Sequence, residues 1–534
     1  MSSHCVIARP PHGPLSEAVV DRSPERVSAN VEDAAHFAGG HADAFALPKT
    51  EADVAALLTS ATSVLPIGAQ SSLTGGATPH GGLILSTERF THVELIDQST
   101  VRVGAGVPLV TLQDFLTPRG LWYPPVPTYT GAFAGGVVAT NAAGAATFKY
   151  GTTRHWVQGL NVVLACGCVL ELHRGRIAAD PERGFEVRCA HGIRAFKPGR
   201  YHQPRVPKCS AGYFAASDME LVDLFIGAEG TLGVITEVVF RLLPTVPSVA
   251  LALVPVLSEA QGLRLVGALR TQSRAKRTDA SLHIDVAAIE SLDRRCIDIL
   301  REDGVDRKND VTIPAGAELL LLIQLELPSD ETAARAFDEI ASVRSDDAPD
   351  TPLVRFCRTL DAHGTFDDTE LAMPGDAARF AQFLAVREAA PVGTNRRVAD
   401  AKRSDERIEK TAADMIVPFE RFGDMMAIYR DGYTRRGLDF AIWGHISDGN
   451  VHPNVIPKSY ADVVSGREAI LEFGREVARM GGCPLAEHGV GRSSVKQQLL
   501  RNLYGAEGIE DMRAIKRVLD PGWVLAPGVL FSQA

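Results

Sequence analysis

The chain of 534 residues has no pair of cysteines at the CxxC spacing, and this absence excludes several classes of site. Its eight cysteines are scattered, and Cys166 and Cys168 are the only two that lie close together in the sequence. This distribution supplies neither the ligand run of an iron–sulfur cluster nor a disulfide framework. We therefore expect reduced and mostly buried thiols in a cytoplasmic protein.

Long apolar runs are missing as well. No stretch approaches 18 uninterrupted apolar residues, and the segment from Met1 to Glu25 has no continuous apolar core like that of a secretory signal. We expect no transmembrane helix, and a protein that is either free in the cytoplasm or attached peripherally to the inner membrane.

Positive charge is scarce, because 55 Lys and Arg face 65 Asp and Glu and the net charge is −10. An acidic protein of this kind is a poor candidate for binding nucleic acid. Residues 183–208 are the exception, with seven basic residues and a single acid, Glu186. A solvated loop is the simpler interpretation of this segment, and a docking surface for an acidic partner or an anion is the alternative.

The length and the hydrophobic content of 45% predict a large core in two or three domains. We expect an N-terminal arm at 1–45, strands and glycine turns at 46–246, long helices with apolar strands at 247–480, and a C-terminal segment at 481–534. The predicted elements include helices at 51–60, 376–390 and 466–480 and a strand at 319–327. An antiparallel sheet covered by helices, an α+β architecture, is the expected fold of the third region.

The stretch most informative about chemistry is 443–454, which reads Trp-Gly-His-Ile-Ser-Asp-Gly-Asn-Val-His-Pro-Asn. Asp448-Gly449 predicts a two-residue hairpin turn that would place His445 opposite His452. Side chains opposed in this way are about 5 Å apart at Cβ, so two imidazoles could reach one metal ion. Asn454 would project from the same face as His452. On this pair alone, ordinary surface or core histidines are the more common interpretation.

A third candidate ligand lies in Pro-Leu-Ala-Glu-His-Gly-Val-Gly-Arg at 484–492. Two histidines and one carboxylate with an open position form the ligand set of a catalytic zinc or similar divalent site. The sequence therefore predicts a divalent metal, with zinc as the first candidate, bound by His445, His452 and Glu487.

Three runs of small residues interrupt the strand-rich region, at 66–78, 131–144 and 227–236. Small residues let backbone N–H groups approach and wrap a pyrophosphate. The first run has neither the GxGxxG spacing nor a Walker lysine, and alone it would be an ordinary turn. Three such loops separated by strands predict an extended cleft for a long dinucleotide.

Together with Leu519-Asp-Pro521 and Pro527-Gly528, these motifs resemble those of the flavin-dependent D-2-hydroxy acid dehydrogenases of the vanillyl-alcohol-oxidase-type FAD superfamily. That group includes D-lactate, glycolate and D-2-hydroxyglutarate dehydrogenases, and the resemblance covers residues 46–534. It implies a two-subdomain FAD-binding domain, an antiparallel-sheet substrate (cap) domain, and a C-terminal helical segment that completes the active site and packs on the FAD domain. FAD would be bound non-covalently.

The resemblance also implies a role for each residue at a matching position. The FAD-binding residues would be Gly68, Ala69, Gln70, Ser71, Ser72, Gly135, Gly136, Thr140, Asn141, Gly144, Glu229, Gly233, Ile235 and Asn450. The metal would be bound by His445, His452 and Glu487, His488 would be the base, and Arg387 and Asn454 would bind the substrate. Lys410 is the candidate for a catalytic lysine that some members use, although the usual register holds Ala412.

The chain departs from the family pattern at several positions. Ser447 stands where the hairpin usually has glycine, and Gln70-Ser71 replaces a usual Gly-Thr in the pyrophosphate loop. Ala526 replaces an asparagine before Pro527-Gly528. These changes bear on the identity of the substrate more than on FAD binding.

The implied reaction is the oxidation of a D-2-hydroxy acid to its 2-oxo acid. A metal on the hydroxyl oxygen lowers its pKa, His488 takes the proton, and Arg387 holds the carboxylate so that the hydride passes to flavin N5. A quinone, an electron-transfer flavoprotein or a cytochrome would accept the electrons, and a homodimer is one option for assembly. Two alternatives stay open: a non-redox flavoenzyme like the alkylglycerone-phosphate synthases, and an inactive flavin-binding subunit of a respiratory complex.

Overall fold

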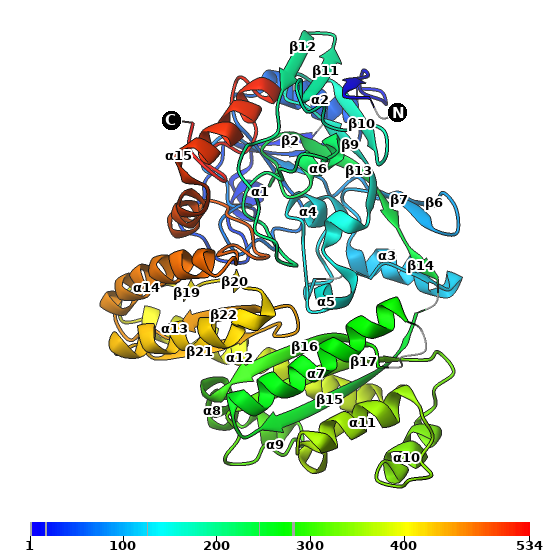
Figure 1. Cartoon of the computed structure of the whole chain (residues 1–534). Helices are drawn as coiled ribbons and strands as arrows, with labels where there is room; N and C mark the ends of the chain where they lie inside the picture. The colour runs from blue at the N-terminus through cyan, green and yellow to red at the C-terminus, as the bar shows by residue number, and fades with distance from the viewer. Residues whose placement is uncertain (1–2, 16–18, 125–126, 245, 280–283, 534) are drawn as a thin grey trace. The chain divides into compact units, whose positions relative to one another are not determined.

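The computed structural model describes residues 3–15, 19–124, 127–244, 246–279 and 284–533 (Figure 1). Contacts between Cα atoms divide the chain into two compact units. Unit 1 comprises Met1–Gly144, Gly151–Pro244 and Cys483–Ala534, and unit 2 comprises Ala145–Tyr150 and Thr245–Gly482. Each unit is thus assembled from segments that are far apart in the sequence.

Unit 1 contains a sheet whose described strands have the order β2-β3-β5-β4. These strands are β2 (Val19–Asp21), β3 (Ala44–Leu47), β4 (Val64–Ile67) and β5 (Leu83–Ser86). β5 pairs in parallel with both β3 and β4, an arrangement that requires crossover connections. Helix α2 (Glu51–Ser60), which connects β3 to β4, has its predicted bounds because Thr50 and Asp53 form a capping box at its start.

A second sheet of unit 1 is antiparallel, with its described strands in the order β10-β9-β13-β7-β6. These strands are β6 (Val93–Leu95), β7 (Thr100–Gly104), β9 (Val157–Val163), β10 (Val169–His173) and β13 (Val234–Arg241). The short helix α4 (Ala134–Ala139) contacts β7 and β13. The sheet therefore supports the second and third small-residue runs, which lie in α4 and directly before β13.

A small third sheet corrects two expectations from the sequence. Strand β1 (Cys5–Ile7) pairs with β11 (Phe185–Cys189), which forms a hairpin with β12 (Gly192–Phe196). The segment 1–45, for which we expected an irregular arm, therefore contributes β1 and β2. Part of the basic segment 183–208 is a hairpin, and Arg194 donates hydrogen bonds of 2.9 Å to the carbonyls of Val518 and Leu519 in α15 (Ser494–Leu519).

The other described elements of unit 1 are short. They are α1 (Pro24–Ser28), α3 (Leu109–Leu116), η1 (Thr117–Arg119), β8 (Leu121–Trp122), η2 (Thr153–His155), α6 (Leu221–Phe225) and β14 (Leu243–Pro244).

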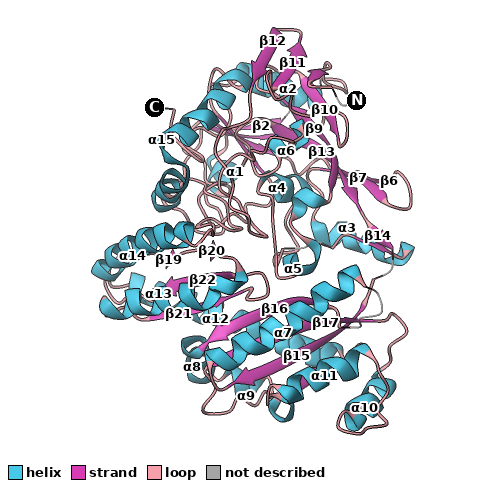
Figure 2. Ribbon diagram, viewed as in Figure 1, coloured by secondary structure: helices cyan, strands magenta, loops and turns pink. Residues whose placement is uncertain are grey.

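Unit 2 is built on an antiparallel sheet in which the described strands follow the order β18-β15-β17-β16-β21-β22-β19, with β20 paired to β22 (Figure 2). These strands are β15 (Ser248–Val256), β16 (Val286–Asp293), β17 (Leu319–Leu327), β18 (Glu370–Ala372), β19 (Thr411–Ala412), β20 (Met415–Ile416), β21 (Phe440–Gly444) and β22 (Asn450–Val455). β17 has the predicted bounds, and the expected α+β fold class is confirmed.

Helices cover this sheet. They are α5 (Thr147–Tyr150), α7 (Glu259–Thr278), α8 (Arg294–Glu302), α9 (Val305–Lys308), α10 (Ala333–Ser342), α11 (Pro352–Ala362), η3 (Phe366–Asp368), α12 (Ala377–Lys402), η4 (Phe419–Arg421), α13 (Phe422–Arg435) and α14 (Tyr460–Arg479). Ile299 of α8 and Phe383 of α12 belong to one buried cluster with Leu251 of β15 and Leu320 of β17. Within the described ranges, every helix is too short or too polar to cross a lipid bilayer.

Two of these helices are longer than the sequence pattern predicts. α12 continues through Pro391 to Lys402 because Gly393 lets it approach α8: a Cβ at Gly393 would lie 2.6 Å from Ile299 Cγ2. This packing outweighs the backbone hydrogen bond that a proline removes. α14 begins before the predicted range because Ser459 and Asp462 form a capping box ahead of its apolar face.

Candidate functional site

The three small-residue runs adjoin one another in unit 1, as the predicted cleft requires. The backbone N–H groups of Gly227 and Glu229 donate to the carbonyls of Val138 and Ala139, at 3.0 and 2.8 Å, and so join the third run to the second. The first run reaches the second at Gly68, where a Cβ would lie 3.4 Å from the Cβ of Phe133.

The C-terminal loop at 484–492 joins the same group. The Glu229 carboxylate accepts hydrogen bonds of 2.8 Å from the N–H groups of Val490 and Gly491. Gly491 also packs against the first run, since a Cβ at this position would lie 2.3 Å from the carbonyl oxygen of Thr74. Burial raises the pKa of Glu229 to about 7, although these two N–H donors favour the charged form.

Each small-residue run holds one non-glycine residue in the left-handed backbone region. The φ angles are 51° for Gln70, 47° for Asn141 and 50° for Glu229. Such conformations are unfavourable for side chains with a Cβ, and they concentrate at binding sites. At Gln70, the side-chain amide offsets this cost by donating to the carbonyls of Asn30 and Ala77, at 3.0 and 2.9 Å.

The glycines of α4 show how the loops could receive a cofactor. A Cβ at Gly135 would lie 2.7 Å from the Cβ of Ala105, so this glycine is needed for packing. A Cβ at Gly136 would meet no atom within 4 Å, so Gly136 borders open space. The Thr140 hydroxyl donates to the Gly136 carbonyl at 2.9 Å, and the Asn141 side chain accepts from the Arg154 N–H at 2.9 Å. The open space at Gly136 lies beside the second small-residue run, where the sequence predicts a dinucleotide.

The remaining residues predicted to bind FAD have ordinary structural contacts. In the first run, the Ser72 hydroxyl accepts from the N–H groups of Thr74 and Gly76, at 3.3 and 3.2 Å. Gly233 packs on Val162, and Ile235 is a buried residue of β13. Gly68, Ala69, Ser71 and Gly144 lie in the same loops of unit 1, whereas Asn450 lies in unit 2.

The hairpin that carries the two histidines differs from its prediction. His452 pairs with Trp443 rather than with His445, and residues 445–449 form a longer connection instead of a two-residue turn. The reason is a competing strand: the Ser447 N–H donates to Ile289 O at 3.3 Å, and Ser447 Oγ accepts from Ile289 N at 3.1 Å. Ser447, which replaces the usual glycine, thereby fixes the connection to β16.

The two imidazoles nevertheless meet. Their ring centroids are 5.5 Å apart with an interplanar angle of 88°, and His445 and His452 are only 3% and 8% exposed. Nδ1 of His445 lies 3.1 Å from Glu290 Oε2, and Nδ1 of His452 lies 3.4 Å from Asp414 Oδ1. A carboxylate against one ring nitrogen orients an imidazole and leaves Nε2 as the nitrogen that could bind a metal.

Glu290 and Asp414 were not among the predicted site residues. Glu290 also forms an ion pair with Arg387 at 3.0 Å, and it therefore contacts both a predicted metal ligand and the predicted carboxylate-binding arginine. Asp414 also accepts from Asn450 Nδ2 at 3.0 Å. Both acids are separated from the histidines by many residues and follow no local motif, so only the sheet pairing reveals them.

Two more predicted site residues of unit 2, Asn454 and Lys410, differ in their burial. The Asn454 side chain is buried and donates to the His452 carbonyl at 2.8 Å. Lys410 is exposed at the edge of β19, and Asp414 is the residue of that segment that contacts His452. The placement of Lys410 therefore adds no support to its predicted catalytic role.

Glu487 and His488 lie in unit 1, in the loop that also contacts Glu229. Glu487 Oε2 lies 2.8 Å from Nζ of Lys208, whose side chain is completely buried, and Glu487 Oε1 lies 3.5 Å from His488 Nε2. A buried lysine of this kind requires a charged partner. Lys208 belongs to the basic segment 183–208, but its composition gave no sign that this residue differs from the others.

The chain matches two family models and a series of known proteins. Residues 42–173 match the FAD binding domain, and residues 271–530 match the C-terminal domain of FAD linked oxidases. Similar proteins include glycolate oxidase subunit GlcD of Bacillus subtilis, at 25% identity over 92% of this chain and 89% of that protein. D-2-hydroxyglutarate dehydrogenase of Xanthomonas citri is 28% identical over 92% of this chain and 89% of its own.

A solved structure shares the fold. The structure of alkyldihydroxyacetonephosphate synthase superposes with a TM-score of 0.59 at 13% identity, over 95% of this chain and 83% of that one. The two family matches, the small-residue runs brought together in unit 1 and this superposition agree with one another. The chain belongs to the vanillyl-alcohol-oxidase-type FAD-linked oxidoreductases, with an FAD-binding domain and an FAD-linked oxidase C-terminal domain.

Proposed function

We propose that this flavoprotein is a metal-dependent D-2-hydroxy acid dehydrogenase that forms the corresponding 2-oxo acid. The observation that carries the proposal is the buried pair of His445 and His452, each ring backed by a carboxylate. Relatives named for glycolate, D-lactate and D-2-hydroxyglutarate support the substrate class.

The proposed metal ligands are His445, His452 and Glu487. Two neutral imidazole nitrogens and one carboxylate oxygen match the donor set of catalytic zinc sites. The Lys208 ammonium lies 2.8 Å from Glu487 Oε2, and this ion pair holds the carboxylate in place, which suits a ligand. Glu290 and Asp414 orient the two rings, a contribution typical of residues that contact metal ligands.

In this proposal the chain positions the substrate and moves one proton. Bound FAD supplies a hydride acceptor, and a bound divalent cation supplies a Lewis acid. Arg387 binds the substrate carboxylate, and its ion pair with Glu290 fixes the direction of the guanidinium. His488 takes the proton from the substrate hydroxyl, because an imidazole titrates near neutral pH. A quinone, an electron-transfer flavoprotein or a cytochrome serves as the electron acceptor.

A substrate panel tests the reaction. The purified protein is mixed without oxygen with D-lactate, glycolate, D-2-hydroxyglutarate and, as a stereochemical control, L-lactate. We expect at least one of the first three acids to bleach the yellow flavin absorbance within a single turnover. Persistent colour with every acid would contradict the proposal and favour a non-redox flavoenzyme or an inactive subunit.

The variant His452→Ala tests the metal separately. We expect bound metal to be lost and flavin reduction to slow by about a hundredfold or more, because the ligand that orients the cation is removed. FAD content should stay near one per chain, since the small-residue runs lie in unit 1. His363→Ala is the matched control, because His363 caps the C-terminal end of α11 and its ring Nδ1 lies 2.8 Å from the Thr359 carbonyl oxygen. Full activity in metal-free protein would show that the histidine pair is structural.

A further inference from the structure

Three cysteine thiols gather in unit 1, apart from every residue assigned above. The sulfur atoms of Cys166, Cys168 and Cys189 all lie within 4.8 Å of one another. Cys166 and Cys168 flank Gly167 in the connection from β9 to β10, and Cys189 is the last residue of β11. The cluster therefore joins a turn of the antiparallel β10-β9-β13-β7-β6 sheet to the hairpin of the small β1-β11-β12 sheet.

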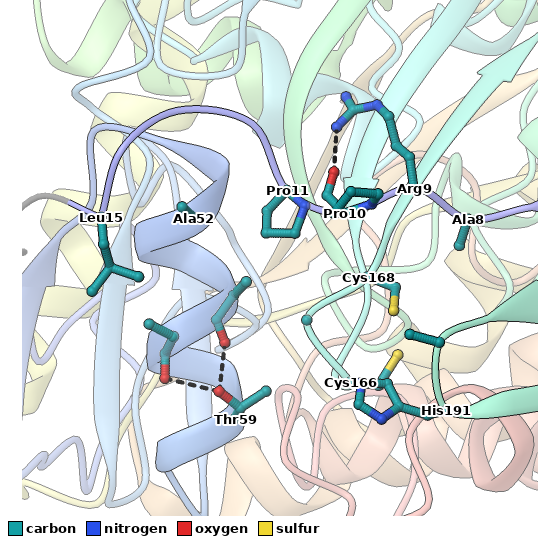
Figure 3. Close-up of a pocket in the computed structure, with 14 residues that line it drawn as sticks. Ala8, Arg9, Pro10, Pro11, Leu15, Ala52, Thr59, Cys166, Cys168 and His191 are labelled. Atoms are coloured by element: carbon teal, nitrogen blue, oxygen red, sulfur yellow. Dashed lines mark hydrogen bonds between the residues drawn. The ribbon is translucent and has the colours of Figure 1, made fainter.

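A histidine completes the pattern. The β11–β12 turn reads Cys189-Ala190-His191. It therefore offers two candidate ligands separated by one residue, as Cys166-Gly167-Cys168 does in the β9–β10 connection. Figure 3 shows Cys166, Cys168 and His191 on the wall of a pocket of about 500 Å³, which Arg9 and Pro10 also line. His191 is exposed in the turn between β11 and β12, two residues after Cys189.

We propose that Cys166, Cys168 and Cys189 bind a thiophilic divalent cation such as Zn²⁺, with His191 as the fourth ligand. Tetrahedral zinc with Zn–S bonds of about 2.3 Å holds its sulfur ligands about 3.8 Å apart. Thiols within 4.8 Å of one another need to move by only about 1 Å to reach that spacing. The Cys₃His set is one of the common structural zinc sites.

The burial of the thiols agrees with this assignment, since Cys168 is buried and Cys166 and Cys189 are partly buried. Zinc binding displaces thiol protons, and the affinity should therefore increase with pH.

The site would be a structural metal site that cross-links two sheets, rather than a second active site. The β11–β12 hairpin touches the β9–β10 turn at its end, and a cation there would tie the two sheets together. The inference stands on residues of unit 1 and does not depend on the histidine pair of unit 2 or on the proposed reaction.

Cadmium titration tests the cysteine site in a protein whose proposed histidine metal site has been disrupted. The FAD-loaded His452→Ala protein, with all its cysteine thiols reduced, is titrated with Cd²⁺. The difference spectrum is followed for thiolate-to-cadmium charge transfer. We expect this absorption to saturate at one equivalent per chain. It should disappear in Cys166→Ser/Cys168→Ser on the same background, and it should persist in the matched control Cys5→Ser, whose thiol lies in β1 and contacts Glu186.

Two outcomes would overturn the assignment. One is the absence of thiolate-to-cadmium absorption although free-thiol counting finds all the cysteines reduced. The other is an equal stoichiometry in the Cys166→Ser/Cys168→Ser protein. Should that double variant fail to retain FAD, Cys189→Ser at the hairpin end provides the same test, with an expected loss of Cd²⁺ affinity of about tenfold or more.

Discussion

At the scale of single residues, Glu229 connects two of the small-residue runs with the C-terminal loop at 484–492. Its backbone joins the second small-residue run, and its carboxylate holds the loop that contains Gly491. It does so with a φ of 50° and a pKa raised to about 7 by burial. A carboxyl group with these properties would make the predicted FAD-binding loops sensitive to pH.

Glu229→Gln should therefore alter the pH dependence of stability. The folded protein holds the Glu229 proton more tightly than the unfolded chain, whose pKa is 4.5. This group's contribution to the free energy of unfolding is thus complete below pH 4.5 and is lost as pH rises through about 7. As pH rises from 5 to 8, the free energy of unfolding of the wild type should fall by about 1 to 3 kcal/mol relative to that of the variant. Urea unfolding at each pH measures this difference.

The control for this comparison is Glu237→Gln, because Glu237 lies in the neighbouring β13 and pairs with His92 and Arg102 near the surface. A stability difference between Glu229→Gln and the wild type that does not change with pH would contradict the assigned pKa.

Several residue-scale features were accessible from sequence and others were not. Gln70 and Ala526 stand out because the resemblance implies glycine and asparagine there, and their φ angles of 51° and 42° are ones that glycine and asparagine adopt at lower cost. Glu290, Asp414 and Lys208 could not be found in this way. Each acquires its role from a partner more than 30 residues away in the chain, and no local spacing encodes such a pairing.

At the scale of elements, local signals predicted the type of an element better than its ends or its register. The strand Leu319–Leu327 and the helix Glu51–Ser60 were predictable because an apolar run and a capping box define them locally. The hairpin register was not, since Ser447 bonds to Ile289 in another strand. The two histidines still came together because both lie at the same end of the hairpin.

Gly444 is the point at which this hairpin is most sensitive. It has a φ of 149°, and a Cβ there would lie 2.7 Å from Val451 Cα and 2.8 Å from Asn450 O, both backbone atoms. Gly444→Ala should therefore push β22 away and displace His452. We expect a loss of bound metal and a stability loss of about 2 kcal/mol or more, measured by metal analysis and denaturant unfolding.

Gly437→Ala provides the matched control. Gly437 has a φ of 65°, but a Cβ there would meet nothing within 4 Å. This variant carries the backbone penalty of about 1 kcal/mol without the steric contact, and it should keep its metal. Equal metal content in the two variants would show that the geometry at Gly444 does not position the histidines.

At the scale of the whole molecule, the two units differ in how the sequence builds them. The predicted FAD-binding loops of unit 1 come from three distant regions of the chain, and the C-terminal segment completes the unit through hydrogen bonds of Val524 and Ala526 with Val64 at 2.7 Å. The sheet of unit 2 comes almost entirely from residues 248–455. Composition and periodicity separated these regions, whereas only the family resemblance implied that the C-terminal segment packs on the FAD domain; the contacts place residues 483–534 in unit 1.

This division predicts a local response to the loss of FAD. A ligand that binds only the folded form stabilises it by about 2.7 kcal/mol at a hundredfold excess over its Kd, so apoprotein should lose this stabilisation. Because the predicted FAD-binding loops lie in unit 1, amide hydrogen exchange should accelerate there on removal of FAD, in peptides from 66–78, 131–144 and 484–492. Peptides from β15 and β17 serve as the internal control, since these strands form the centre of the unit 2 sheet and should keep their protection. Equal acceleration in both sets would mean that the two units unfold as one cooperative body.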